Sequence, residues 1–136
     1  MKKIFSSIAL SLSLVLPTIA LAAGSSYSIS YFFETGLTGQ TRSFTGGKDL
    51  VGVFYSVACR DYNCNNTFDT TDTFNVALYR DGFWSDDYIG SSKAPRSGNK
   101  TITWSNVGEG DYYIKLWKPS DGTYVKSQSG SKLYIK

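Results

Sequence analysis

The chain has 136 residues, of which 15% are aromatic, and a formal net charge of +3. This length builds one domain with a modest core. The sequence contains no histidine, which excludes a Ser-His-Asp or Cys-His catalytic arrangement and a His-based zinc site. We therefore expect one small domain that belongs to none of these enzyme classes.

The first 22 residues carry the parts of a secretory signal peptide. Met1–Lys3 gives a short positive region, an apolar run extends over Ile4–Leu21, and Ala20–Ala22 supplies a small-residue cleavage site. Serines and a proline interrupt the run, which disfavours a transmembrane helix of roughly 20 apolar residues. We expect a cleaved signal peptide at residues 1–22, a single domain at residues 23–136 and no later membrane span.

Cleavage of the signal peptide changes the net charge of the mature domain. Removal of Lys2 and Lys3 lowers the net charge from +3 to about +1. The remaining cations are scattered, so we expect no nucleic-acid partner.

Outside the cell or in a periplasm, Cys59 and Cys64 are expected to pair, because these compartments are oxidising. A disulfide needs Cα atoms about 4.4–6.8 Å apart, so the chain has to turn back between them. An intermolecular bridge and free thiols are the alternatives.

Beyond the signal peptide, apolar and polar residues alternate with a period of two, and no helical period appears. The pattern predicts an all-β fold, a single antiparallel β-sandwich of immunoglobulin-like or jelly-roll type with about eight or nine short strands. Leu50–Ala58 is the most apolar stretch, so we expect it to be a central strand covered on both faces. We expect a polar loop at Ser91–Asn99 and a turn at Gly108–Asp111 between two paired strands.

Those two strands resemble part of a known kind of module. Residues 98–104 (GNKTITW) and 110–116 (GDYYIKL) are similar to a strand pair of pre-peptidase C-terminal domains and related jelly-roll or immunoglobulin-like modules of secreted bacterial proteins. The resemblance implies a non-catalytic accessory fold used in binding or secretion, and it carries no functional residue.

The loop after the central strand has the spacing of a calcium site. Positions one, three, five, seven, nine and twelve of an EF-hand-like pattern are Asp61, Asn63, Asn65, Thr67, Asp69 and Asp72. The order is similar to dockerin-type calcium loops, so Ca²⁺ is the one cofactor that we expect. Position six is Asn66 where the pattern has glycine, and the flanks are strands instead of helices. The alternative is an Asx-rich turn in which these side chains cap their own backbone.

A second candidate site combines aromatic and acidic side chains. Its residues are Phe83, Trp84, Asp86, Tyr88 and Trp117. We expect a hairpin turn at Asp81-Gly82 followed by a strand, in which Phe83 and Trp84 point to opposite faces and one is exposed. Aromatic faces stack on the apolar faces of sugars while carboxylates bind their hydroxyls. The alternative is packing of these rings within the sandwich.

These patterns predict a secreted, non-enzymatic β-sandwich that binds an extracellular glycan or protein as a monomer, with calcium as a candidate stabilising ion. The alternative is a small secreted bacterial effector such as a bacteriocin, toxin or inhibitor. An enzyme is disfavoured further because Asp86 and Asp87, as neighbours in a strand, would point to opposite faces.

Overall fold

Alternating inward and outward side chains organise residues 24–136, the part of the chain that this computed structural model describes. The strands are β1 (Ser26–Ser28), β2 (Phe32–Phe33), β3 (Gly36–Thr38), β4 (Arg42–Phe44), β5 (Leu50–Cys59), β6 (Thr67–Phe68), β7 (Thr73–Arg80), β8 (Asp87–Pro95), β9 (Gly98–Trp104), β10 (Gly110–Trp117), β11 (Tyr124–Ser127) and β12 (Lys132–Ile135). Over these residues no helix is long and apolar enough to cross a membrane. The signal peptide expected at residues 1–22 lies outside the described residues.

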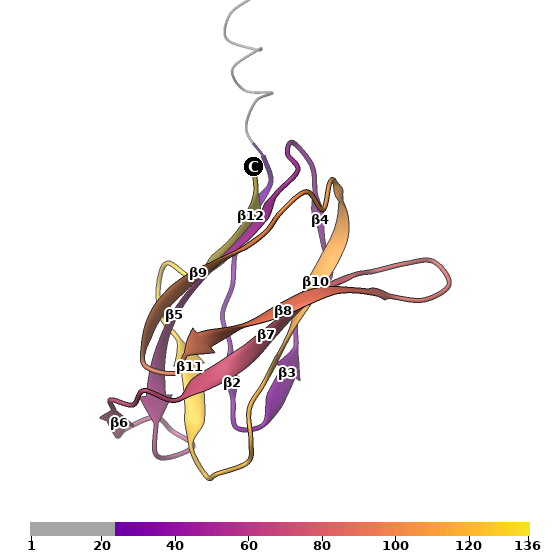
Figure 1. The fold of residues 1–136 in the computed structure, drawn as a ribbon. Coiled ribbons are helices and arrows are strands. Elements are labelled where there is room, and N and C mark those ends of the chain that lie inside the picture. Colours follow the sequence, from indigo (N-terminus) through magenta and orange to yellow (C-terminus); the bar gives the residue numbers. More distant parts are fainter. Residues whose placement is uncertain (1–23) are drawn as a thin grey trace, which may run out of the picture.

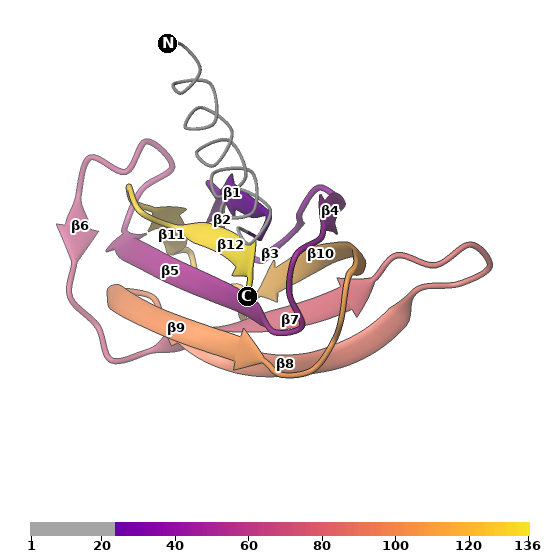
Figure 2. The ribbon, with the colours of Figure 1, turned by 90° about the horizontal axis from the view of Figure 1, so that it is seen from above.

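The strands form two antiparallel sheets that pack as a sandwich, which confirms the expected fold class. The seven-stranded sheet has the order β1-β12-β5-β11-β2, with β6 and β9 also paired to β5. The five-stranded sheet has the order β3-β10-β7-β8, with β4 also paired to β10. Figure 1 shows β7, β8 and β10 running together, and Figures 1 and 2 both show the β7–β8 connection extending away from the rest of the domain.

The core lies between the sheets and consists of alternate residues of the long strands. On β7 and β10 these are the apolar residues that recur with a period of two, namely Phe74, Val76, Leu78, Tyr112, Ile114 and Leu116, and all are at most 5% exposed. Aromatic rings from both sheets meet there; the ring centroids of Phe54 on β5 and Phe74 on β7 lie 6.4 Å apart. Burial of these apolar side chains is the main stabilising term of the fold.

The strand β5 is central, as its apolar sequence indicates, because it pairs with four strands. Its inward residues Leu50, Phe54 and Ala58 are fully buried. Cover on its outward face is less complete than expected, since Tyr55 is 38% exposed. The outward face is solvated because no third layer lies on it within the described residues.

Residues 24–136 hold twelve strands instead of eight or nine, because five of the twelve are only two or three residues long. The loop expected at Ser91–Asn99 is wrong: β8 runs to Pro95 and β9 starts at Gly98. The reason is pairing with β7, which extends along β8 from Asp87 to Pro95 with one register shift between Leu78 and Tyr79. The ladder satisfies the backbone of this polar stretch, and its polar side chains need only face solvent.

The strand pair expected from residues 98–104 and 110–116 is also wrong. β9 pairs with β5 in the seven-stranded sheet, whereas β10 pairs with β3, β4 and β7 in the other sheet. The segment between them crosses from one sheet to the other, and Asn106 adopts a left-handed backbone there (φ 57°). The Asn106 N–H is held by Asp49 Oδ1 at 2.8 Å, which fixes the crossing.

A buried ionic cluster joins turns at the end of β10. Arg96 is 6% and Lys118 is 4% exposed, and both donate to the carboxylate of Asp121. The distances are 2.7 Å from Arg96 Nη1 to Oδ2 and 2.8 Å from Lys118 Nζ to Oδ1. Arg96 Nε also donates to the Thr73 carbonyl at 2.8 Å. The cluster therefore ties the β8–β9 turn to the β10–β11 turn and to the start of β7.

Candidate functional site

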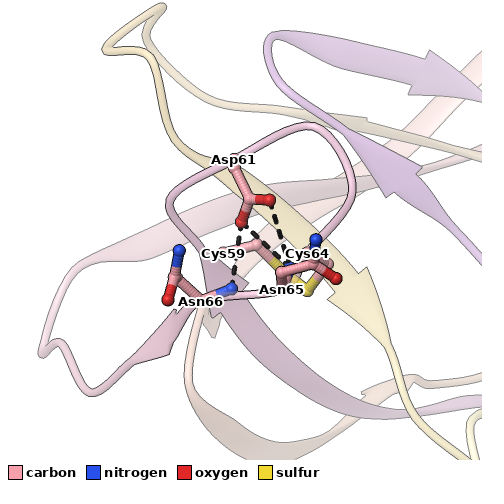
Figure 3. The surroundings of a disulfide bond; sticks show 5 residues. All are labelled: Cys59, Asp61, Cys64, Asn65 and Asn66. Carbon is pink, nitrogen blue, oxygen red and sulfur yellow. Dashed lines mark hydrogen bonds between the residues drawn. A yellow bond between two sulfur atoms is a disulfide. The ribbon is translucent and has the colours of Figure 1, made fainter.

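The two cysteines form the expected bond. Cys59 ends β5 and Cys64 follows in the next turn, with Cα atoms 4.9 Å apart. The Cys64 N–H donates to the Asp61 carbonyl at 3.0 Å, and Cys64 adopts φ 56°. The chain thus turns back within Asp61–Cys64, and the bond closes the turn between β5 and β6, which pair with each other in the seven-stranded sheet (Figure 3).

The Asp61 carboxylate caps the backbone of this turn. Oδ1 accepts from the N–H groups of Asn65 and Asn66, both at 3.0 Å, and Oδ2 lies 3.2 Å from the Asn65 nitrogen (Figure 3). This is the Asx-rich turn that the sequence offered as the alternative to a metal site. An acidic side chain used in this way is already satisfied by backbone donors.

The last three residues of the calcium pattern, Thr67, Asp69 and Asp72, have partners other than Asp61. Thr67 opens β6, which pairs with β5 and extends the chain where a calcium loop would wind tightly. Asp69 Oδ1 accepts from Ser97 Oγ at 3.2 Å, and the Asp72 N–H donates to the Thr70 hydroxyl. Within residues 24–136 no three His, Cys, Asp or Glu side chains gather as a metal site. These residues do not fit a Ca²⁺ shell in this arrangement, and calcium binding stays a prediction.

The connection between β7 and β8 is longer than the expected two-residue turn. The last paired residues are Arg80 and Asp87, so the connection spans 81–86 and no strand starts at Phe83. Gly82 is required, because a Cβ there would lie 2.1 Å from the Ser85 carbonyl oxygen. Phe83 and Trp84 are 90% and 91% exposed and pack edge-to-face, with ring centroids 4.9 Å apart. The expectation that only one of them faces outward is therefore wrong, since both lie outside a strand.

A row of tyrosines crosses the outer face of the five-stranded sheet. Tyr79 of β7 is flanked by Tyr88 of β8 and Tyr113 of β10, at centroid distances of 5.6 Å and 5.4 Å. The rings of Tyr79 and Tyr113 are nearly parallel, with an interplanar angle of 8°. Lys115 Nζ lies 4.9 Å from the Tyr79 centroid, a cation–π contact. Cross-strand register explains the row, because directly opposed residues share a face.

Two open depressions lie along β10 beside this row, and we call them together the β10 groove. One has a volume of about 370 Å³ and the other about 340 Å³. They are lined by Thr38, Gly39, Thr41, Asp81, Asp86, Tyr113 and Lys115, and by Leu37, Thr38, Tyr79, Lys115, Leu116 and Trp117. Because both include Thr38 and Lys115, they are neighbours. Trp117 is 41% exposed at the far end.

The acidic end of the β10 groove has a fixed charge. The Tyr113 hydroxyl donates to Asp86 Oδ2 at 2.5 Å, and the Gly82 N–H lies 3.3 Å from Asp86 Oδ1. The bond from Tyr113 is the main cause that lowers the pKa of Asp86, and the same bond raises the pKa of Tyr113 to about 12. Asp86 is therefore an ionised acceptor and Tyr113 a protonated donor across the whole physiological range.

The structure brings some of the predicted ligand-binding residues together. Asp86 and Trp117 line the two depressions of the β10 groove, and Tyr88 lies in the adjoining tyrosine row. Phe83 and Trp84 are at the tip of the 81–86 connection and do not line either depression. Thr38, Tyr79 and Lys115 are among the groove residues that the sequence reasoning missed. The alternation places Tyr79 and Lys115 on the outward face of their strands, but it does not show which strands lie beside β10.

No protein-family model and no curated protein matches this chain. The chain is similar to the Yersinia pseudotuberculosis-derived mitogen YPM at 15% identity and a TM-score of 0.38, over 83% of this chain and 86% of that one. It is similar to TmCBM61, solved with β-1,4-galactotriose, at 10% identity and a TM-score of 0.31, over 84% and 78%. A chain of infectious bursal disease virus, Gt strain, matches at 7% identity and a TM-score of 0.38, over 82% of this chain but 32% of the viral one. We infer no function from likenesses at these TM-scores.

Proposed function

We propose that this protein is a secreted, non-enzymatic β-sandwich that binds an extracellular carbohydrate chain along the β10 groove. The observation that carries the proposal is the line of two depressions that share Thr38 and Lys115. A linear arrangement of neighbouring subsites suits a polymer better than a compact ligand. Secretion is supported by the signal-like sequence at residues 1–22 and by the Cys59–Cys64 bond.

The chemistry of the groove matches that of a sugar chain. At one end Tyr79 and Trp117 offer ring surface on which the apolar face of a pyranose can pack. At the other end Asp86 accepts hydrogen bonds from sugar hydroxyls. Lys115 lies between them and donates to either subsite. Flat, rigid rings with a few placed polar groups are what a sugar-sized ligand needs for orientation.

Asp86 of this groove suits binding better than the role of a general acid. Asp81 and Asp86 line one depression, and paired carboxylates are the machinery of glycosidases. A general acid needs a raised pKa, however, and the hydrogen bond from Tyr113 lowers the pKa of Asp86. Asp86 is thus held in the form that accepts hydrogen bonds and cannot donate a proton.

Affinity electrophoresis against a panel of soluble polysaccharides tests the proposal. We expect at least one polysaccharide to retard the wild-type protein. The Tyr79→Ala/Trp117→Ala variant should lose at least tenfold in affinity, because stacking surface is removed from one subsite. Tyr55→Ala, which removes a ring that is 38% exposed on the other sheet, is the matched control and should bind as the wild type does. A panel that retards none of the proteins would refute the proposal.

A second candidate function is a secreted effector that binds a protein target. It is favoured by Phe83 and Trp84, whose rings are 90% and 91% exposed on a projecting connection (Figure 1). Exposed aromatic pairs of this kind are typical anchors of protein interfaces. A Phe83→Ser/Trp84→Ser variant should then lose growth inhibition of target bacteria while Tyr79→Ala/Trp117→Ala keeps it. The carbohydrate proposal predicts instead that Tyr79→Ala/Trp117→Ala weakens polysaccharide binding and that Phe83→Ser/Trp84→Ser does not.

A further inference from the structure

The sandwich is open along one edge, where the segment from β1 to β2 faces the segment from β3 to β4. A cavity of about 210 Å³ lies there, between the two sheets. Its aliphatic lining consists of Ile29, Leu37, Ile114, Leu116 and Leu133, and Tyr31, Gly39, two serines, Gln40 and Arg42 complete its wall. β1 ends one sheet and β3 ends the other, so among the strands of residues 24–136 no ladder closes this edge. The cavity therefore connects core side chains of both sheets with solvent.

Arg42 is the charged residue of this cavity, and its position is unusual. In the β4–β10 register it stands opposite Tyr112, which is fully buried. Opposed residues of an antiparallel pair share a face, so the Arg42 side chain projects to the inner side of its sheet. Its guanidinium carbon lies 5.2 Å from the Tyr27 ring centroid. The Tyr27 hydroxyl donates to the Ser43 carbonyl at 2.6 Å, which fastens the two sheets beside the guanidinium.

The Arg42 guanidinium lacks an anionic partner in the described part of the chain. The ion pairs of residues 24–136 both belong to Asp121, with Arg96 and Lys118. A half-buried guanidinium is favoured beside a carboxylate or phosphate, with which it forms paired hydrogen bonds. At the mouth of an apolar cavity it supplies the charge that would hold the head of an amphipathic anion.

The volume of the cavity limits the size of the apolar part of such a ligand. An apolar cavity of roughly 150 Å³ admits benzene, so the 210 Å³ here admits an apolar group somewhat larger than benzene, the size of a medium-length aliphatic chain. We propose that this cavity binds a medium-chain aliphatic carboxylate, with its chain among Ile114, Leu116 and Leu133 and its carboxylate on Arg42. The cavity shares the wall residues Leu37, Gly39 and Leu116 with the β10 groove, but Arg42 does not line the groove, so loss of Arg42 tests this site alone.

Methyl NMR titration of the purified, delipidated protein with octanoate, octanol and octylammonium tests this site. Octanoate should shift the methyl signals of Ile114, Leu116 and Leu133 and should bind more tightly than octanol, with octylammonium weakest. Each methylene removed from the acid should weaken binding about fourfold, as expected for burial of a CH₂ group. This comparison of ligands uses the wild-type protein and does not depend on the folding of a variant.

Variants locate the carboxylate. Arg42→Ala should weaken octanoate at least tenfold and leave octanol unchanged, while Arg42→Lys should retain part of the preference for the acid. The matched control is Arg60→Ala, since Arg60 also lies over an aromatic ring, at 4.2 Å from the Phe68 centroid, but outside the cavity. The proposal is overturned if octanoate leaves the three methyl signals unmoved, if octylammonium binds as tightly, or if Arg42→Ala binds octanoate like the wild type.

Discussion

Tyr113 on β10 donates its hydroxyl proton to Asp86 Oδ2 at 2.5 Å, which ties the 81–86 connection to the outer face of the five-stranded sheet. The two residues are far apart in sequence and come from different elements. Their contact fixes the acidic end of the β10 groove and anchors the base of the segment that carries Phe83 and Trp84. The same contact helps to cover Tyr113, which is only 8% exposed although it lies on the outer face of β10.

Removal of this hydrogen bond should change the titration of Asp86. The pKa of Asp86 is lowered in the folded protein, so the bond contributes stability above the ordinary aspartate pKa, and the contribution is lost as the pH falls through the folded value. In Tyr113→Phe the pKa of Asp86 should rise toward its ordinary value, measured by carboxyl ¹³C NMR. Tyr79→Phe, whose hydroxyl does not bond to Asp86, should leave it unchanged. An equal midpoint in Tyr113→Phe and wild type would contradict the assignment.

The disulfide should contribute modestly to stability. It closes a short loop with a sequence separation of 5, for which the chain-entropy model gives about 2 kcal/mol. A Cys59→Ala/Cys64→Ala variant should lose about that amount in urea unfolding, and reduction of the wild type should produce a similar loss. The Cys59→Ala/Cys64→Ala variant treated with the same reductant serves as the control, because the reductant should not change its stability. Equal stability of oxidised and reduced wild type would show that the loop is held by other contacts.

The ionic cluster should be more sensitive to loss of its anion than a surface pair. Burial would raise the pKa of Asp121, but hydrogen bonds from Lys118, Thr123 and Arg96 outweigh it and hold that pKa well below its usual range. The ionised Asp121 carboxylate therefore contributes stability at a pH above the pKa of Asp121 in the unfolded chain. This contribution is lost as the pH falls through the lower pKa of Asp121 in the folded protein. Asp121→Asn leaves two buried cations without an anion and should cost about 2 kcal/mol, less than for a fully buried pair because the Asp121 side chain is 38% exposed.

A surface aspartate provides the comparison for this variant. Asp69 accepts one hydrogen bond, from Ser97 at 3.2 Å. Asp69→Asn should therefore change the free energy of unfolding by less than about 0.5 kcal/mol. Equal effects of Asp121→Asn and Asp69→Asn would mean that the cluster does not act as a buried network.

The turn at Asp61 should be stabilised by backbone capping and not by metal. Asp61→Ala removes the acceptor for the N–H groups of Asn65 and Asn66 and should cost about 1 kcal/mol. The thermal midpoint of the wild type should be the same in millimolar CaCl₂ and in chelator. A chelator-reversible rise with Ca²⁺, absent from Asp61→Ala, would instead establish the calcium site that the spacing predicts.

Local features of the fold could be predicted from the sequence. The period of two predicts the strands β5, β7 and β10 and the core residues of β7 and β10, because side-chain direction depends only on neighbours along the chain. For β5 it predicts cover on both faces, and Tyr55 is 38% exposed. The turn between Cys59 and Cys64 followed from the geometry of a disulfide. The sequence of the loop is compatible with Asp61 as a capping residue and with Asp61 as a calcium ligand. The position of β6, which the sequence does not predict, distinguishes the two interpretations.

Pairing between distant strands could not be predicted in this way. Residues 101–104 and 112–117 look like a hairpin, yet they belong to opposite sheets, since partner choice depends on contacts far along the chain. The β10 groove has the same origin: Tyr79, Lys115 and Thr38 become neighbours only through the register of β7, β10 and β3. The 81–86 connection was mistaken for a tight turn because Asp81-Gly82 is a hairpin signal by itself.

Backbone ¹⁵N shift mapping with a polysaccharide that retards the protein tests the central claim most directly. If the β10 groove binds the chain, the amide shifts should concentrate at Thr38, Lys115 and Trp117, and Tyr79→Ala/Trp117→Ala should abolish them at the same ligand concentration. Shifts confined to the opposite sheet around Tyr55, or shifts unchanged in that variant, would contradict it.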